Sequence, residues 1–184
     1  SPATNPFYSN GSSLTIAGAC TTGNTVELSG DATNSMTCTA NAYSFNVSQS
    51  TDATLTYSVR QKNASDIYSG AVSVSWVRDT TAPSVPTITS PAVSPLINTA
   101  NSISISGACE NNATVSLTGD GTSSVVCSSS TYSLSVNKST DGVYNFIISQ
   151  TDRAGNASGS IVQNWRRDTV VPAAPTITQP ALNP

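Results

Sequence analysis

Residues 107–120 read GACENNATVSLTGD, and a closely similar phrase, GACTTGNTVELSGD, occupies residues 18–31, 89 positions earlier. Val115 and Leu117 alternate with polar residues inside the phrase, as Val26 and Leu28 do in the earlier copy. An apolar residue at every second position indicates a β-strand with one buried face. The alternation and the repeat together predict tandem domains built from strands.

The 89-residue period extends over the whole chain. Trp76 recurs as Trp165, and residues 78–89 recur in recognisable form as residues 167–178. Single-domain repeats in an array commonly serve as spacers or binding stalks. The expected boundaries are residues 1–82 for repeat 1, residues 83–171 for repeat 2, and residues 172–184 for a linker with the first strand of a third repeat.

Alternating apolar positions predict about seven strands in each repeat, and no window has a helical period. Asp120-Gly121 and Asp141-Gly142 are turn signals between strands of repeat 2. Seven short antiparallel strands predict an all-β fold of two tandem immunoglobulin-like β-sandwich domains. The expected strands of repeat 2 span residues 86–91, 102–109, 113–118, 122–128, 131–137, 142–151 and 159–167. In repeat 1 the counterpart of 86–91 falls almost wholly before Ser1, so that repeat is expected to lack most of its first strand.

Each repeat carries two cysteines 18 positions apart, and the chain contains no histidine and no C-x-x-C motif. Metal binding and thiol chemistry fit this pattern poorly. We therefore predict one disulfide in each repeat, Cys20–Cys38 and Cys109–Cys127. A small domain closed by a disulfide indicates an oxidising compartment, hence an extracellular, cell-surface or periplasmic location.

Composition argues against several classes of function. Only 9% of the residues are charged, the net charge is −3, and no basic patch stands out, which argues against nucleic acid as a partner. No apolar run approaches the ~20 residues of a membrane span, so membrane insertion is not expected. Without histidine, neither a Ser–His nor a Cys–His dyad can form. We predict that the protein is not an enzyme and has no catalytic residues.

The phrase at residues 107–120, the loop Asp152-Arg153-Ala154-Gly155-Asn156 and the linker Asp168-Thr169 with Pro172 and Pro175 form a recognisable pattern. It resembles the bacterial Ig-like tandem repeats of large secreted or surface adhesins, over essentially the whole chain. Two features depart from that family. The cysteine pair is uncommon in it, and repeat 1 has Asn63-Ala64-Ser65-Asp66 in place of the full loop.

The resemblance implies a structural role in cell adhesion, as a stalk or fibre segment that holds a distal unit away from the cell. The alternative is a module that binds a glycan or a protein through its polar loops, with an unknown host or prey surface ligand. Partners would then also include neighbouring repeats, or copies of the chain joined by strand addition through residues 175–180.

The resemblance also implies a possible cofactor, because some members of the family hold calcium at their domain junctions. No cofactor is certain here, but Asp79, Glu110 and Asp152 are the candidate calcium ligands at the junction between the repeats. Three carboxylates with added carbonyls or waters would suit this cation. The alternative reading is ordinary turn chemistry, in which these side chains accept hydrogen bonds from nearby backbone.

Overall fold

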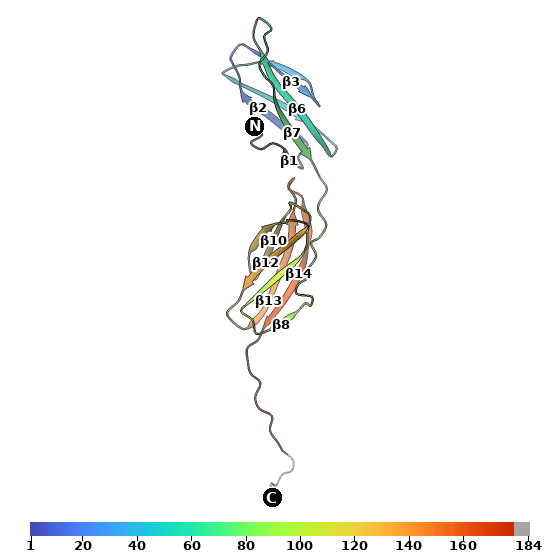
Figure 1. Ribbon diagram of the computed structural model, residues 1–184, viewed down its shortest axis with the longest axis vertical. Coiled ribbons are helices and arrows are strands. Elements are labelled where there is room, and N and C mark those ends of the chain that lie inside the picture. Colours follow the sequence, from blue (N-terminus) through green and yellow to red (C-terminus); the bar gives the residue numbers. More distant parts are fainter. Residues whose placement is uncertain (179–184) are drawn as a thin grey trace.

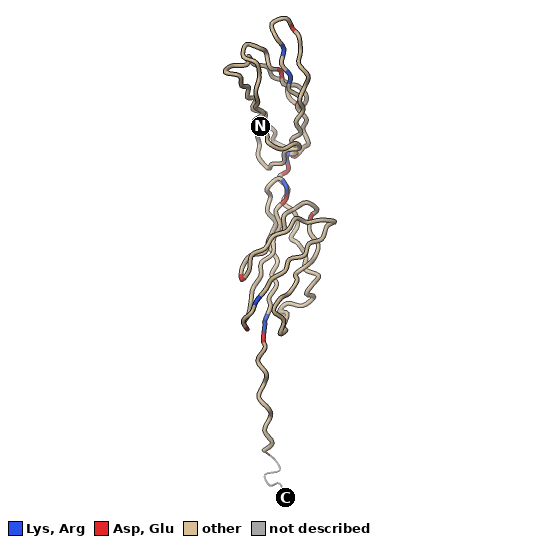
Figure 2. The backbone as a smooth tube through the Cα atoms, turned by 60° about the vertical axis from the view of Figure 1, so that its left-hand side comes forward, with Lys and Arg blue, Asp and Glu red and all other residues tan. Residues whose placement is uncertain are grey.

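The computed structural model describes residues 1–178, which form two β-sandwiches arranged end to end (Figure 1). The described residues contain fourteen strands and no helix, so the all-β tandem architecture is confirmed. None of these residues forms a helix long and apolar enough to cross a membrane. Charged positions are sparse along the tube, and a small group of both signs lies between the sandwiches (Figure 2).

The two repeats use the same strands in the same order. Those of repeat 1 are β1 (Phe7–Ser9), β2 (Ser13–Ala19), β3 (Thr25–Gly30), β4 (Asn34–Thr37), β5 (Ala42–Ser48), β6 (Ala53–Lys62) and β7 (Val72–Arg78). Those of repeat 2 are β8 (Leu96–Asn98), β9 (Ser102–Ala108), β10 (Thr114–Gly119), β11 (Ser123–Val126), β12 (Thr131–Asn137), β13 (Gly142–Thr151) and β14 (Ala157–Arg167). In repeat 1 the sheet β1-β7-β6-β3-β4 faces the pair β2-β5, and in repeat 2 the sheet β11-β10-β13-β14-β8 faces the pair β9-β12.

The first strand of repeat 2 differs from its predicted form. Residues 87–90 pair with β9, through Thr87 N–H to the Ala108 carbonyl (3.0 Å) and Thr89 N–H to the Ser106 carbonyl (2.8 Å). The chain then crosses to the other sheet, where β8 runs parallel to β14. Pro91 and Pro95 lie in the crossing, and proline has no N–H to continue a ladder. The prediction of one strand at 86–91 therefore missed β8.

Each sandwich closes over a core of alternating inward-facing side chains. Trp76 and Trp165 are fully buried, which places both in the core. Each indole N–H donates to a side-chain oxygen of the short parallel strand, Ser9 Oγ at 3.0 Å in repeat 1 and Asn98 Oδ1 at 2.9 Å in repeat 2. A buried tryptophan needs such a partner for its polar atom.

The structure contains both disulfides. Cys20–Cys38 and Cys109–Cys127 have Cα–Cα separations of 6.0 Å, within the usual range. Each bond joins the segment after the second strand of its repeat to the segment after the fourth, so it ties one sheet to the other. These two bonds use all four cysteines of the sequence.

Candidate functional site at the junction between the repeats

The end of repeat 1 is fixed by a carboxylate in the turn before β6. Asp52 forms an ion pair with Arg78 at 2.7 Å. It also accepts hydrogen bonds from the backbone N–H and from the hydroxyl of Thr80, each at 3.0 Å. In repeat 2, Asp141 holds Arg167 and Thr169 in the same way. The Arg-Asp-Thr sequence that ends each repeat is therefore anchored before the linker begins.

These bonds lower the pKa of both anchoring carboxyls. The backbone N–H of Thr80 is the main cause for Asp52, and that of Thr169 is the main cause for Asp141. A lowered folded-state pKa means that the unfolded chain binds the proton more tightly. Each carboxylate therefore contributes its full stabilisation of the folded repeat at a pH above its unfolded-state pKa of about 4. This contribution is lost as the pH falls below that value.

Asp52→Asn and Asp141→Asn should each lower the melting temperature of their repeat at pH 7. The loss should shrink as the pH falls below about 4, because the wild-type carboxyl is then protonated too. Calorimetric scans from pH 7 to pH 2.5 measure both effects. Equal losses at pH 7 and pH 2.5 would show that the charge of the carboxylate is not what anchors the linker.

The linker hydrogen-bonds to repeat 1 at its start and to repeat 2 from Ser84 onward. Asp79 N–H donates to the Ser9 carbonyl at 3.1 Å, and the Asp79 side chain accepts from Thr81 N–H at 2.9 Å. Further on, the Ser84 carbonyl accepts the side-chain amide of Gln150 at 2.7 Å, and Pro83 and Pro86 are buried. The linker thus passes directly into the strand segment 87–90, and its proline and backbone contacts restrict bending.

The β13–β14 loop, residues 152–156, faces this linker and has a rigid form. The Asp152 carboxylate accepts hydrogen bonds from the backbone N–H and from the side-chain amide of Asn156, each at 2.8 Å. Gly155 has a φ of +95°, a conformation that side chains with a Cβ rarely adopt. Ala154 is buried although it lies in a loop. The Asp-Arg-Ala-Gly-Asn sequence therefore encodes a closed turn.

This loop contacts repeat 1 directly. Asn10 donates its backbone N–H to the Ala154 carbonyl at 3.1 Å and its side-chain amide to Asn156 Oδ1 at 3.1 Å. Asn156 also donates to the Asp79 carbonyl at 2.9 Å. Arg153 lies 4.2 Å from the centre of the Tyr8 ring and donates to its hydroxyl at 3.1 Å. Four polar contacts and one cation–π contact therefore join the two sandwiches beside the covalent linker.

The predicted calcium ligands do not form a cluster. Among residues 1–178, no three Cys, Asp or Glu side chains are close enough to hold a metal ion. Asp79 and Asp152 accept local hydrogen bonds instead, which is the turn chemistry given as the alternative. Glu110 lies in the β9–β10 loop, where its backbone N–H donates to Gln150 Oε1 at 2.9 Å.

Repeat 1 has a different loop at the corresponding place. Its β6–β7 loop is held by Asn63, whose side-chain oxygen accepts the N–H groups of Ser65 and Ile67 at 2.9 and 3.1 Å. Ala64 stands where repeat 2 has Arg153, and Ile67 stands where it has Asn156. The side chains that form the junction in repeat 2 are therefore replaced in repeat 1.

Comparison with known proteins supports the fold. No family model matches the sequence, and no curated protein matches it. Among solved structures, the fibronectin(III)-like modules of Clostridium thermocellum CbhA are similar over 91% of this chain and 91% of theirs, with a TM-score of 0.57 and 17% identity. The BSP domain of a biofilm-associated protein aligns over 91% of this chain and 30% of its own, with a TM-score of 0.32 and 14% identity. The chain thus has the fold of tandem fibronectin(III)-like or Ig-like modules.

Proposed function

We propose that this chain is a stalk or fibre segment of an extracellular bacterial repeat adhesin, and that its role is mechanical rather than enzymatic. The observation that carries the proposal is the junction. The linker hydrogen-bonds to repeat 1 at Asp79 and to repeat 2 at Ser84 and residues 87–90, and the loop at 152–156 bonds to Tyr8, Asn10 and Asp79. A spacer needs such a junction, because a freely bending one would not keep a distal unit away from the cell.

Two further features support an extracellular spacer. Both disulfides suit an oxidising environment, where small domains commonly use such bonds. The sandwiches present mainly short uncharged side chains, with only 9% charged residues in the chain. The resemblance of the linker and loop sequences to surface adhesin repeats agrees with both features.

The double variant Asn10→Ala/Arg153→Ala should loosen the junction without unfolding either sandwich. It removes the side-chain contacts of Asn10 and Arg153 across the junction, and it leaves the Asn156–Asp79 bond and the internal bonds of the 152–156 loop in place. Small-angle scattering should show a smaller radius of gyration and a broader distance distribution, because bent forms become populated. Melting of each repeat should change little.

Arg166→Ala is the matched control, since it removes an exposed arginine whose ion pair, to Asp168 at 2.9 Å, lies away from the junction. Its scattering profile should equal that of the wild type. If the double variant scatters like the wild type, or if the wild type already scatters as a bending chain, the junction contacts do not fix the repeats and the spacer proposal fails.

A second function, binding through the loops, is favoured by one observation. The β6–β7 loop of repeat 1 exposes Ile67 and Tyr68, which are 67% and 44% accessible, where repeat 2 has Asn156 and Ala157. Arg60 stacks on the Tyr68 ring at 3.9 Å, so the ring is held in place on the surface. If the β6–β7 loop binds a glycan or a protein, the chain should be retained on a glycan array or a protein array. Tyr68→Ala should abolish that retention, whereas Tyr8→Ala should not.

A further inference from the structure

The loop between β1 and β2 contains Asn10 followed directly by Gly11, and this is the only Asn-Gly pair in the sequence. Both residues are exposed to solvent. An asparagine side chain is most prone to spontaneous deamidation when glycine follows it, because the missing Cβ leaves the next backbone nitrogen open to approach and gives the chain freedom to bend. The sequence therefore places its most reactive amide in this loop.

The backbone nitrogen of Gly11 is free to react. Among residues 1–178, no acceptor takes a hydrogen bond from its N–H, whereas its carbonyl accepts a hydrogen bond from Arg78 Nε at 3.1 Å. An N–H held in a ladder or a turn would have to break that bond before it could approach a side chain. No such bond has to break at Gly11.

The reaction needs only water as a co-reactant. The Gly11 nitrogen loses its proton to base and attacks the side-chain carbonyl carbon of Asn10, and the C–N bond of the side-chain amide breaks. Ammonia leaves with a proton, and a cyclic imide is formed. Water then opens the imide at either of its carbonyls, which gives aspartate or, where the chain runs through the side-chain carbon, isoaspartate. One water is consumed and one ammonia is released, and nothing is oxidised or reduced.

Asn10 is also one of the residues that hold the junction. Its backbone N–H donates to the Ala154 carbonyl at 3.1 Å, and its side-chain amide donates to Asn156 Oδ1 at 3.1 Å. The Asn156 amide cannot turn round, because its nitrogen donates to the Asp79 carbonyl at 2.9 Å and to the Asp152 carboxylate at 2.8 Å. Its oxygen therefore faces position 10 whatever side chain stands there.

Aspartate at position 10 would face the Asn156 oxygen with a second oxygen. The hydrogen bond would be lost, and two acceptors that no proton joins repel each other. The new charge would also lie beside the Asn156 amide, from which the Asp152 carboxylate already accepts a hydrogen bond. Arg153, the cation of the loop, already contacts the ring and the hydroxyl of Tyr8. Deamidation to aspartate therefore weakens the contact between the repeats.

Isoaspartate would disturb the backbone as well. It inserts an extra carbon into the chain between Ser9 and Gly11, whose carbonyls accept hydrogen bonds from Asp79 N–H and Arg78 Nε, each at 3.1 Å. These two bonds tie the β1–β2 loop to the end of β7 and the start of the linker. A lengthened backbone would have to shift at least one of them, so both products act at the junction.

We propose that Asn10 is a deamidation site, and that its conversion to aspartate or isoaspartate loosens the junction between the repeats as the protein ages. The loosening rests on the stiff junction of the proposed function, whereas the deamidation does not. Repeat 2 has Thr99-Ala100 in the equivalent loop, so the reactive pair belongs to the loop of repeat 1 alone.

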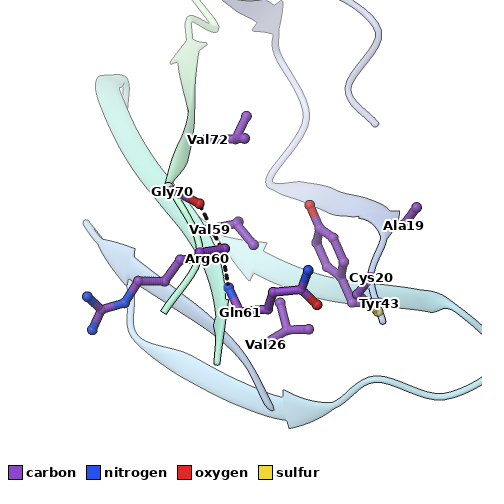
Figure 3. A pocket seen from close by; sticks show the side chains of 10 residues that line it. Ala19, Cys20, Val26, Tyr43, Val59, Arg60, Gln61, Gly70 and Val72 are labelled. Carbon is purple, nitrogen blue, oxygen red and sulfur yellow. Dashed lines mark hydrogen bonds between the residues drawn. The ribbon is translucent and has the colours of Figure 1, made fainter. Parts of the chain in front are cut away.

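The interior of repeat 1 lies away from this loop. A pocket of about 280 Å³ lies between its sheets, and Ala19, Tyr43 and Gln61 contribute to the lining (Figure 3). The pocket lies where β2 ends, whereas the loop with Asn10 lies where β2 begins. The NMR signals of Tyr43 and Gln61 should therefore stay unchanged on deamidation, and they report whether repeat 1 remains folded.

The deamidation is tested by peptide mapping with mass spectrometry while the purified chain is incubated at neutral to mildly alkaline pH. Asn10 should gain the mass of an acid in place of an amide about tenfold faster than Asn63 or Asn156, each of which is followed by alanine. The rate should rise with pH, because the nitrogen attacks without its proton. Gly11→Ala should slow the reaction at Asn10 by about tenfold.

Gly11→Ala is also the matched control for the structure. A Cβ at this position would lie 3.8 Å from the Ser13 carbonyl oxygen and from Ser9 Oγ, which is ordinary contact, and Ala100 occupies the equivalent position in repeat 2. The variant should therefore have the junction of the fresh wild type and should keep it during incubation.

The loosening is tested by small-angle scattering. Asn10→Asp and the incubated wild type should both show a broader distance distribution than the fresh wild type, while incubated Gly11→Ala should not. An Asn10 that reacts no faster than Asn63 would overturn the site, and an Asn10→Asp chain that scatters like the fresh wild type would overturn the loosening. A fresh chain that already bends would refute the spacer and the loosening together, and the rate at Asn10 would still decide whether the site exists.

Discussion

Gly107→Ala should destabilise repeat 2 by about 2–4 kcal/mol, the range expected when overpacking displaces a strand and its hydrogen bonds. The added methyl group would overlap the carbonyl oxygen of Thr87, which is backbone and has little freedom to move. Residues 87–90 would then leave β9, and Pro86 and Ile88 would lose their burial. Calorimetry of the variant should show one transition shifted down and one unchanged.

The equivalent substitution in repeat 1, Gly18→Ala, is the internal control for this prediction. Its new methyl group meets only the end of the Tyr43 side chain, so the cost should stay below about 1 kcal/mol, as for most changes that the surroundings can accommodate. Equal losses in the two repeats would show that residues 87–90 are not held against Gly107 as described.

Removing one disulfide should destabilise its repeat by about 3 kcal/mol, since the bond closes an 18-residue separation and restricts the unfolded chain. The variant Cys109→Ala/Cys127→Ala suits the test, because Cys127 is 1% accessible and alanine buries no new polar atom there. The matched variant Cys20→Ala/Cys38→Ala should lower the other transition by a similar amount. A reducing agent should lower both transitions of the wild type and neither transition of the four-alanine chain; an unchanged wild type under reduction would contradict the structural role of these bonds.

Much of the fold follows from patterns that are local in the sequence. Apolar alternation located most strands of repeat 2 to within one or two residues, and the repeated cysteine spacing identified both disulfides. The split of the first strand was missed, because β8 is only three residues long and pairs with β14, almost 70 positions away. Its signal in the sequence was the pair Pro91 and Pro95, which prevents a continuous ladder.

The junction was predicted less well than the sandwiches. The loop at 152–156 was recognised as distinctive, but its partners Tyr8 and Asn10 were not, since nothing in the local sequence links positions more than 140 residues apart. The candidate calcium ligands Asp79 and Asp152 accept hydrogen bonds from nearby N–H groups, a contact that the spacing of acidic residues does not reveal. Gln163 interrupts the apolar face of β14, and its buried amide donates to the Val93 carbonyl at 2.9 Å.

Rigidity at the junction is measured most directly by residual dipolar couplings of the two repeats in a weakly aligned sample. Two sandwiches held by the 79–90 linker and by the contacts of Arg153 and Asn156 should report one common alignment tensor, equal in magnitude and orientation. Asn10→Ala/Arg153→Ala should separate the two tensors. Tensors that already differ in magnitude in the wild-type chain would show that the repeats move independently, and would contradict a stiff extracellular spacer.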